Sequence, residues 1–278
     1  MEANLKILRQ YFPLGGDYPP ALTIGLTIFL PFLYILNFFI SINDHIALSP
    51  TDLFKLDLNR VSLYPLGHLS IFHVLMNVLA LITPLSNFER RHGTVYTGVV
   101  LNLLAVSTAI PYCILGSVFI PNTKIIGASA WAFSFAGYFA YKESLIKPTF
   151  QITPSHSLPT LATPLIPLIL IAIFVPGSSF FGHLFGLISG YALAYGYLAK
   201  LAPPSKVIEF IESKLDGLIN LIPSMFIYYR EVEAKHLREQ TDYVSLIGPT
   251  ETILPTTNNP TAPASNPTFA GQGHVLGA

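Results

Sequence analysis

Charged residues and cysteine are both scarce in this chain of 278 residues. Asp, Glu, Lys and Arg make up 11% of the sequence and hydrophobic residues 51%, whereas about 25% of residues are charged in average soluble domains. The single cysteine, Cys113, excludes an intrachain disulfide and a metal site built from several thiolates. With 15 basic and 15 acidic residues and no basic stripe, the chain lacks the charge pattern of a nucleic-acid-binding protein. We therefore expect a membrane protein with no metal, no other cofactor and no nucleic-acid partner.

Long apolar runs without any charged residue are abundant instead. A helix that spans a lipid bilayer needs about 17–25 apolar residues, so most of these runs hold one span each. The last run is long enough for two, which are separated by the helix-breaking residues Pro176-Gly177-Ser178-Ser179. The sequence thus predicts an all-α membrane protein with six transmembrane helices, within the charge-free runs 18–43, 61–88, 92–123, 125–141 and 148–199.

Basic residues are distributed unevenly between alternate loops. If residues 1–20 lie in the cytosol, the cytosolic segments carry twelve Lys and Arg residues, and the opposite loops carry only Lys55, Arg60 and Lys124. The positive-inside rule predicts such an asymmetry. We therefore expect both termini in the cytosol, and even-numbered helices that begin on the opposite side of the membrane, at about 64–88, 127–142 and 180–199.

Polar residues capable of chemistry gather near the starts of these three helices. His68, His73 and Asn77 lie early in the second helix, Ser129 begins the fourth and His183 lies near the start of the sixth. Taken singly, each has an ordinary explanation, because a helical serine usually bonds its own backbone and an intramembrane histidine is about as often a packing residue as a functional one. Their shared depth favours a common site.

Small residues surround the serine and follow the histidine of the sixth helix. Ser129 stands in the sequence Gly127-Ala128-Ser129-Ala130, and Gly182, Gly186 and Gly190 recur at every fourth position. If these helices pack along their small residues, Ser129 and His183 can come within hydrogen-bond reach, as an activated nucleophile requires. The alternative is an ordinary packing seam.

The acidic residues between 18 and 200 all lie in loops or at helix ends, so a Ser-His-Asp triad is excluded and serine chemistry here would use a dyad. Acyl transfer also needs hydrogen-bond donors for an oxyanion. His73 and Asn77 lie four residues apart on one helical face and could supply them, as could the backbone N–H of Ser129.

Taken together, these blocks resemble the rhomboid intramembrane serine proteases. The family's order and spacing are matched by His68-x4-His73-x3-Asn77, Gly127-x-Ser129 and His183-x2-Gly186-x3-Gly190, and the resemblance covers about residues 20–200. The string at 88–93, FERRHG, is similar to the family's signature after the second helix. Within the family, Tyr64-Pro65-Leu66 and the residues at 92–98 and 176–180 most resemble the fungal rhomboids of the Golgi.

The resemblance implies the rhomboid fold, Ser129 as the nucleophile, His183 as the general base and then acid, and His73 and Asn77 as oxyanion donors. It also implies supporting roles for four further residues, with Phe133 stacked beneath His183: Gly127, Phe133, Gly186 and Gly190. Two positions depart from the usual pattern, since Ala130 replaces a glycine and Phe133 stands where tyrosine is common. Ala130 would be costly if the backbone there required a positive φ.

The resemblance further implies that the substrates are transmembrane segments of proteins in the same lipid bilayer. It places the chain in the Golgi, with the endoplasmic reticulum and the endosome as alternatives. The fifth span, at 161–176, is interrupted by Pro164 and Pro167 and is either a gate for a substrate helix or a kinked static helix. His68 either lines the mouth of a water-filled cavity or bonds a loop carbonyl at the interface.

Composition divides the chain into four segments: a cytosolic segment at 1–20, the catalytic domain at 21–200, an amphipathic segment at 201–230 and a tail at 231–278. Apolar residues at three- and four-residue steps predict a helix over 205–229, which either lies on the membrane surface or docks on a soluble surface. The tail is rich in Thr, Pro and Asn and is predicted to be disordered, because it cannot bury enough apolar area to offset chain entropy.

Near the end of the tail stands an F-x-G-x-G-x-x-L string that resembles an SHP box. Such boxes dock cofactors onto the amino-terminal domain of valosin-containing protein, an AAA ATPase that extracts membrane proteins. Two apolar anchors separated by glycines suit a short linear peptide, although a chance match in an unstructured end is the alternative. The residues of this motif are Phe269, Gly271, Gly273 and Leu276.

Two other functions compete with the protease. A rhomboid-fold pseudoprotease, similar to the derlins, would act as a membrane-protein chaperone or as an adaptor for an AAA ATPase, but the presence of both Ser129 and His183 argues against it. A small transporter is the second alternative. No charged residue lies in the middle of a span and no inverted repeat is visible, so nothing in the sequence favours transport.

Overall fold

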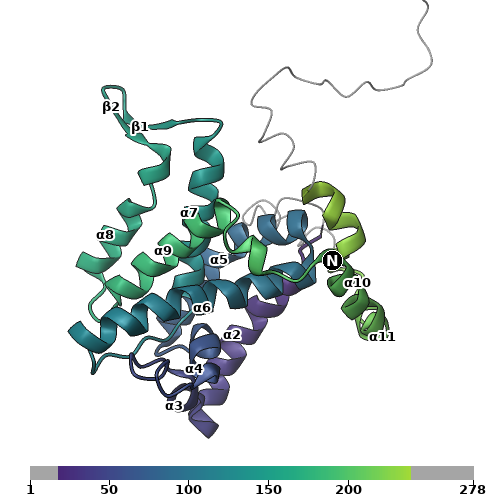
Figure 1. The fold of residues 1–278 in the computed structure, drawn as a ribbon, viewed down its shortest axis with the longest axis horizontal. Helices are drawn as coiled ribbons and strands as arrows, with labels where there is room; N and C mark the ends of the chain where they lie inside the picture. Colours follow the sequence, from purple (N-terminus) through teal and green to yellow (C-terminus); the bar gives the residue numbers. More distant parts are fainter. Residues whose placement is uncertain (1–17, 239–278) are drawn as a thin grey trace, which may run out of the picture.

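The computed structural model describes residues 18–238 and is built almost entirely from helices (Figure 1). The N-terminal residues 1–17 and the tail from 239, with the SHP-like motif, lie outside the described residues. The helices are α2 (Ala21–Ile40), α3 (Ile42–Ile46), α4 (Leu58–Leu63), α5 (Ile71–His92), α6 (Thr94–Phe119), α7 (Ser129–Ser144), α8 (Leu165–Phe174), α9 (Phe180–Ala194), α10 (Ser205–Lys214) and α11 (Asp216–Ile219). The short elements are the 3₁₀ turns η1 (Tyr64–Leu66), η2 (Thr160–Ala162) and η3 (Ala199–Leu201), and the strands β1 (Thr149–Thr153) and β2 (His156–Pro159).

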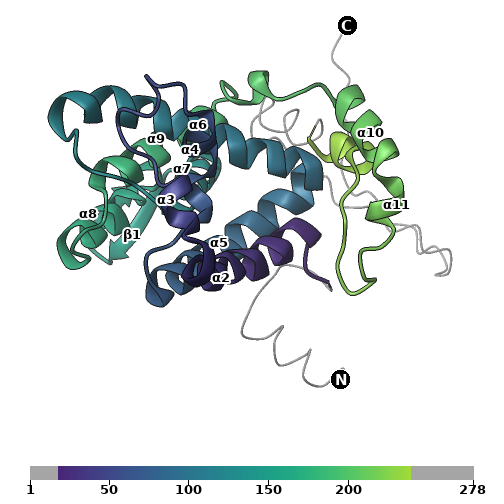
Figure 2. The same cartoon turned by 90° about the horizontal axis from the view of Figure 1, so that it is seen from below.

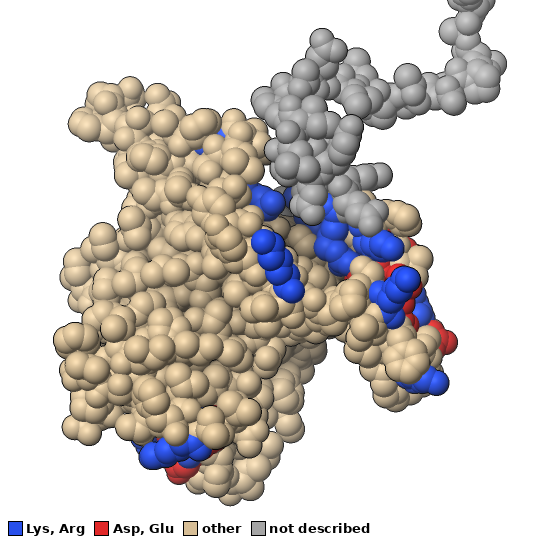
Figure 3. Space-filling model, viewed as in Figure 1, with Lys and Arg blue, Asp and Glu red and all other residues tan. Residues whose placement is uncertain are grey.

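Helices α2 and α5 to α9 occupy the regions where spans are predicted. Within the described residues, α2, α5 and α6 are long and apolar enough to cross a membrane, while the stretch Thr160–Phe174 and α9 are shorter apolar helices. The mostly helical fold therefore agrees with the sequence, and the count of six complete spans stays a prediction. In Figure 3, charged side chains gather around α10 and α11 and at the lower edge of the molecule, further Lys and Arg side chains lie in the upper middle, and the left side of the view is uncharged.

Helix α7 lies at the centre of the bundle, where it packs against α5, α6 and α9 (Figures 1 and 2). Its contact with α9 is close because both helices present small residues. A Cβ atom added to Gly190 would lie 1.9 Å from the Ser134 carbonyl oxygen, and one added to Gly186 would lie 2.6 Å from that of Ala130. The Ser134 hydroxyl donates to the carbonyls of Ala130 and Gly186, each at 2.8 Å, and so ties the two backbones together. These contacts fix the relative depth of α7 and α9.

A buried carboxylate joins α2, α5 and α6 at the end of the bundle. Glu89 is 0% exposed and accepts hydrogen bonds from the backbone N–H groups of Leu22 and Thr23 and from the Thr23 and Thr94 hydroxyls, at 2.8–2.9 Å. Because Pro20, the N-cap of α2, provides no side-chain cap, Glu89 satisfies the first N–H groups of that helix from another element.

The second apolar helix begins later than predicted. The sequence indicates a start near residue 64, whereas α5 starts at Ile71, after the separate turn η1. Pro65 and Gly67 favour this break, and the Ser70 hydroxyl caps α5 by accepting from the His73 N–H at 3.1 Å. His68 therefore lies in the loop before the helix and not within it.

The region before and within the fifth span also differs from prediction. Pro164 is the N-cap of α8 and Pro167 lies in its first turn, where a missing N–H costs little, so neither proline kinks the helix. The chain between α7 and α8 forms an antiparallel hairpin of β1 and β2, which the all-α prediction did not include.

The predicted single helix over 205–229 is divided. Helices α10 and α11 are followed by an irregular stretch through Pro223, and residues 231–238, assigned by sequence to the disordered tail, are helical.

Tertiary contacts explain why this region differs from the prediction. Ile227 exchanges backbone hydrogen bonds with Pro19 and Ala21. The Tyr229 carbonyl accepts from the Thr94 N–H and the Tyr229 N–H donates to the Thr94 hydroxyl, while Glu231 and Ala234 are buried. On the surface, the Arg230 guanidinium bonds Asp216 at 2.6 Å and lowers the pKa of that carboxyl.

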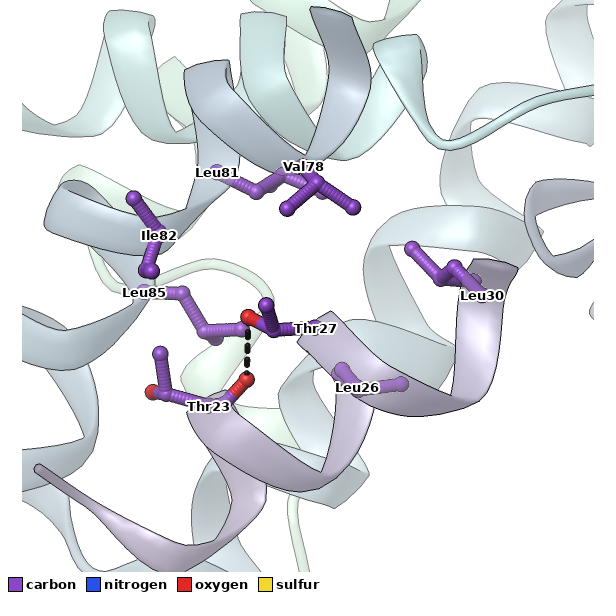
Figure 4. A pocket seen from close by; sticks show the side chains of 8 residues that line it. All are labelled: Thr23, Leu26, Thr27, Leu30, Val78, Leu81, Ile82 and Leu85. Carbon is purple, nitrogen blue, oxygen red and sulfur yellow. Dashed lines mark hydrogen bonds between the residues drawn. The ribbon is translucent and has the colours of Figure 1, made fainter. Parts of the chain in front are cut away.

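A small crevice opens between α2 and α5 (Figure 4). Its polar groups are two threonine hydroxyls: that of Thr27 bonds the Thr23 carbonyl oxygen at 2.8 Å, and that of Thr23 bonds Glu89. The crevice thus holds no free polar side chain that could take part in chemistry. It is lined by Thr23, Leu26, Thr27, Leu30, Val78, Leu81, Ile82 and Leu85.

Candidate active site

The candidate nucleophile stands at the first turn of α7. Ser129 is the first residue of that helix, and the loop before it is fixed by a backbone bridge between Leu48 and Ile125 and by the Gly127 N–H, which donates to the Tyr64 carbonyl at 2.9 Å. Gly127 has φ +122°, a conformation that glycine adopts without strain. The turn therefore places Ser129 as a half-buried residue whose preceding loop is held from two sides.

His183 meets this serine from α9. Ser129 Oγ lies 2.9 Å from His183 Nε2, the geometry of a hydroxyl that donates to an imidazole nitrogen. The start of α9 is capped by the Ser179 hydroxyl, which accepts from the Gly182 N–H at 3.1 Å. The imidazole is 7% exposed and stacks on Phe133, with ring centroids 4.7 Å apart and 27° between the planes. The ring is thus held by a phenylalanine at the position where a tyrosine would add a hydroxyl.

His73 and Asn77 approach the same turn from α5. A Cβ atom added to Gly127 would lie 2.5 Å from His73 Cε1 and 3.5 Å from Asn77 Nδ2, so both side chains border the turn that precedes Ser129. Asn77 is 5% exposed, and within residues 18–238 its Nδ2 has no hydrogen-bond partner. A buried amide donor without a partner is unusual and costly, which suits a group that is satisfied only when a ligand is bound.

His68 lies behind these residues and not at the mouth of a cavity. It is 1% exposed, its Nε2 accepts from the Ala128 N–H at 3.4 Å, and its ring meets that of His73 edge-on at 5.0 Å. Its own carbonyl accepts from Asn43 Nδ2 at 2.8 Å. The prediction that His68 lines the mouth of a water-filled cavity is therefore wrong, because the residue packs under the loop that leads to Ser129.

Ala130 causes no backbone strain. Within residues 18–238 the non-glycine residues with positive φ are Ser41 and Leu56, and Ala130 lies in the regular helix α7 with its methyl group buried. The strain that a positive φ would impose on an alanine at position 130 is therefore absent. The close approach to α9 involves the Ala130 backbone and the missing side chain of Gly186, and not the Ala130 methyl.

Within residues 18–238, no carboxylate joins Ser129 and His183 as a third member. In the described part of the chain, no hydrogen bond or ion pair joins His183 to an acidic residue, and Glu89 is fully engaged at α2 and α6. The same residues contain no group of three or more His, Cys, Asp or Glu side chains that could hold a metal ion. The arrangement therefore offers a Ser-His pair with two polar side chains beside it.

Comparison with known proteins identifies the family. The family model of the rhomboid domain matches residues 55–200, about half of the chain, and this range includes Ser129, His183, His73 and Asn77. The chain belongs to the rhomboid family.

Fungal rhomboids are similar over most of this chain. It is 49% identical to rhomboid-type serine protease 2 of Kluyveromyces lactis, over 97% of this chain and 99% of that protein. It is 48% identical to the protein of the same name from Saccharomyces cerevisiae, over 90% and 95% of the two chains, and 38% identical to that of Neurospora crassa, over 68% and 67%. Family and apolar helices together make this rhomboid a membrane protein.

Sequence reasoning missed residues that hold the site by hydrogen bonds to its backbone. Nothing in the pattern indicated that the Tyr64 carbonyl would bond Gly127 or that Asn43 would bond the His68 carbonyl, since these contacts depend on tertiary structure. Ser70 carried a usable signal, because a serine directly before an apolar helical run is a typical N-cap.

Proposed function

We propose that this rhomboid is a serine endopeptidase that cleaves transmembrane segments of other membrane proteins within the bilayer. The observation that carries the proposal is the 2.9 Å contact between Ser129 Oγ and His183 Nε2 inside a membrane domain. Family membership and the names of the fungal relatives support the reaction class. A dyad is the proposed form of the catalytic unit.

In the first step, Ser129 Oγ attacks the scissile carbonyl carbon while its proton passes to His183 Nε2. The Phe133 ring beneath the imidazole holds Nε2 toward the serine, which replaces the orienting role that an aspartate has in a triad. The tight α7–α9 contact at Gly186 and Gly190 keeps the two side chains at this distance.

The tetrahedral intermediate then carries a negative oxygen that needs donors. Asn77 Nδ2, which is buried and unpartnered within the described residues, and the imidazole of His73 border the turn before Ser129. With the Ser129 backbone N–H they form the proposed oxyanion hole. Such donors act most strongly on charge that develops in the transition state.

Collapse of the intermediate breaks the C–N bond, and the proton on His183 Nε2 passes to the leaving amine. The acyl group stays on Ser129 until water, activated by the neutral imidazole, attacks the ester and releases the second product. Both protein groups then return to their starting states, so no cofactor is consumed.

The substrate must present an extended peptide bond, since a helical bond has its carbonyl engaged in the helix. We propose α8 as the gate through which a substrate helix reaches the site. Leu168 is the one buried residue of α8, so this helix is held by fewer buried side chains than α7 or α9.

We also propose a Golgi location with both termini in the cytosol, by similarity to fungal rhomboids of the Golgi and by the distribution of basic residues. In that orientation the site opens toward the lumen. Fluorescence protease protection of a terminal tag on intact Golgi vesicles tests it: loss of the tag on adding protease is expected, and full protection would reverse the assignment.

The tail is proposed to dock an AAA ATPase of the valosin-containing protein type through Phe269 and Leu276. Isothermal titration of a peptide covering 262–278 against the amino-terminal domain of that ATPase tests this. Binding that weakens in the Phe269→Ala peptide is expected. No measurable binding, with a known SHP peptide as the positive control, would leave the motif a chance match.

Reconstitution in liposomes with a transmembrane reporter substrate separates the protease from the pseudoprotease. We expect the parent chain to cleave the reporter and Ser129→Ala to leave it intact, with Ser144→Ala as the matched control at the other end of the same helix. Equal cleavage by Ser129→Ala, or no cleavage by the parent chain of several reporters, would favour the adaptor function instead.

A further inference from the structure

The hairpin between α7 and α8 has the composition of a membrane-contacting element. Its strands run Thr-Phe-Gln-Ile-Thr and His-Ser-Leu-Pro, and the whole stretch from 148 to 199 contains no Asp, Glu, Lys or Arg. Hairpins that project into water normally carry charged side chains on their exposed edges. This one projects beyond the helices at the end where α7 finishes and α8 begins (Figure 1), and its projecting surface is uncharged (Figure 3).

At the two central pairs of the hairpin, before the register shift between Gln151 and Thr153, apolar and polar side chains lie on opposite faces. Phe150 lies opposite Leu158, and Gln151 lies opposite Ser157. Directly opposed residues share a face of a two-stranded sheet and neighbouring residues take opposite faces, so one face carries Phe150 with Leu158 and the other Gln151 with Ser157. Phe150 is 43% exposed, because no other part of the described chain covers it fully.

The helical stretch that follows the hairpin is shorter than the hydrocarbon core of a membrane is thick. The helical stretch Thr160–Phe174 is about 22 Å long, and the hydrocarbon core is about 30 Å thick. If this stretch crosses the bilayer, as proposed for the gate helix, the residues beside it lie at the depth of the bilayer boundary, and Pro159 of β2 directly precedes it. Backbone groups at that depth need internal partners, which the β1–β2 ladder supplies along its inner edge.

We propose that the β1–β2 hairpin rests in the boundary between lipid headgroups and acyl chains, with Phe150 and Leu158 facing the acyl chains and Gln151 and Ser157 facing water. Lys147 supports this position. Its Nζ lies 5.8 Å from the centroid of the Phe150 ring, which places beside the apolar residue a cation that can bind headgroup phosphates. The occupant of the apolar face is therefore lipid, and the hairpin anchors the start of α8.

Single cysteines on the two faces, carrying the environment-sensitive dye NBD, test the proposal in phosphatidylcholine liposomes. The background is Cys113→Ala, which removes the one native thiol, checked for an unchanged helical circular dichroism spectrum. The labelled variants are Phe150→Cys and Leu158→Cys on one face, with Gln151→Cys and Ser157→Cys as the matched controls on the other. Reporter cleavage is not measured, so the result does not depend on the proposed protease.

We expect blue-shifted NBD emission at 150 and 158 that is quenched at least twofold more by doxyl-labelled lipid than by aqueous iodide, with the reverse order at 151 and 157. Iodide quenching at all four positions would overturn the proposal, because the hairpin would then stand in water. Blue-shifted emission at 150 and 158 without quenching by doxyl lipid would also overturn it, since another protein surface would cover the face.

Discussion

At the scale of single residues, Asn77 and His73 test whether the site is built for an oxyanion. Asn77→Ala and His73→Ala should each lower turnover of a transmembrane reporter by ~10²–10³-fold, because each removes one donor from the charged intermediate. Folding should be preserved, since Asn77 Nδ2 makes no hydrogen bond within residues 18–238 that the change would break. The measurement is the initial cleavage rate in liposomes at saturating reporter.

Asn220→Ala serves as a control for that experiment, because its exposed side chain bonds Asp216 on α11, away from the site. A rate for Asn77→Ala equal to that of the control would remove the oxyanion role of Asn77. A proportional loss of helical signal would instead show that Asn77 is needed for the fold.

At the scale of elements, the glycine ridge on α9 determines whether the side chains of Ser129 and His183 meet. Gly190→Ala places a methyl group against the Ser134 carbonyl, so α9 must move away from α7. We expect destabilisation of about 1–3 kcal/mol in thermal unfolding, and at least tenfold slower cleavage as the Ser129–His183 distance grows.

Gly25→Ala is the matched control for this change. Gly25 also lies inside an apolar helix, α2, but a Cβ atom there meets nothing within 4 Å. Its replacement should leave the rate unchanged and stabilise the helix by about 0.5–1 kcal/mol. Equal cleavage rates and equal stabilities of Gly190→Ala and Gly25→Ala would contradict the account of the α7–α9 contact.

The sequence predicted apolar helices well where charge-free runs are long, as for α2 and α6. It failed where tertiary contacts decide. Residues 231–238 look like tail by composition, but Arg238 donates to the His92 carbonyl and to Glu231 and lies over the Tyr96 ring at 4.4 Å. The Ser129 to His183 distance could be expected from small-residue spacing, whereas the burial of His68 depends on loop packing that no local pattern reports.

At the scale of the whole molecule, Glu89 joins the bundle to the chain that follows it. Its carboxylate bonds α2 and Thr94, whose backbone N–H donates to the Tyr229 carbonyl. Glu89→Gln places an amide NH₂ against N–H groups. We therefore expect the free energy of unfolding to fall by about 2–3 kcal/mol and the melting temperature in detergent to fall with it. The exposed Glu143→Gln is the control, and equal melting temperatures for both variants would contradict a charged, structural Glu89.

The central claim is that Ser129 is a nucleophile activated by His183, and covalent labelling measures it most directly. The liposome-embedded chain is treated with a fluorophosphonate, which forms a stable adduct only with an activated serine, and the modified residue is located by peptide mass spectrometry. We predict one adduct, on the peptide that contains Ser129, and its loss in His183→Ala with the fold retained. Labelling of the His183→Ala variant at the parental rate, or an adduct on another serine, would contradict the account.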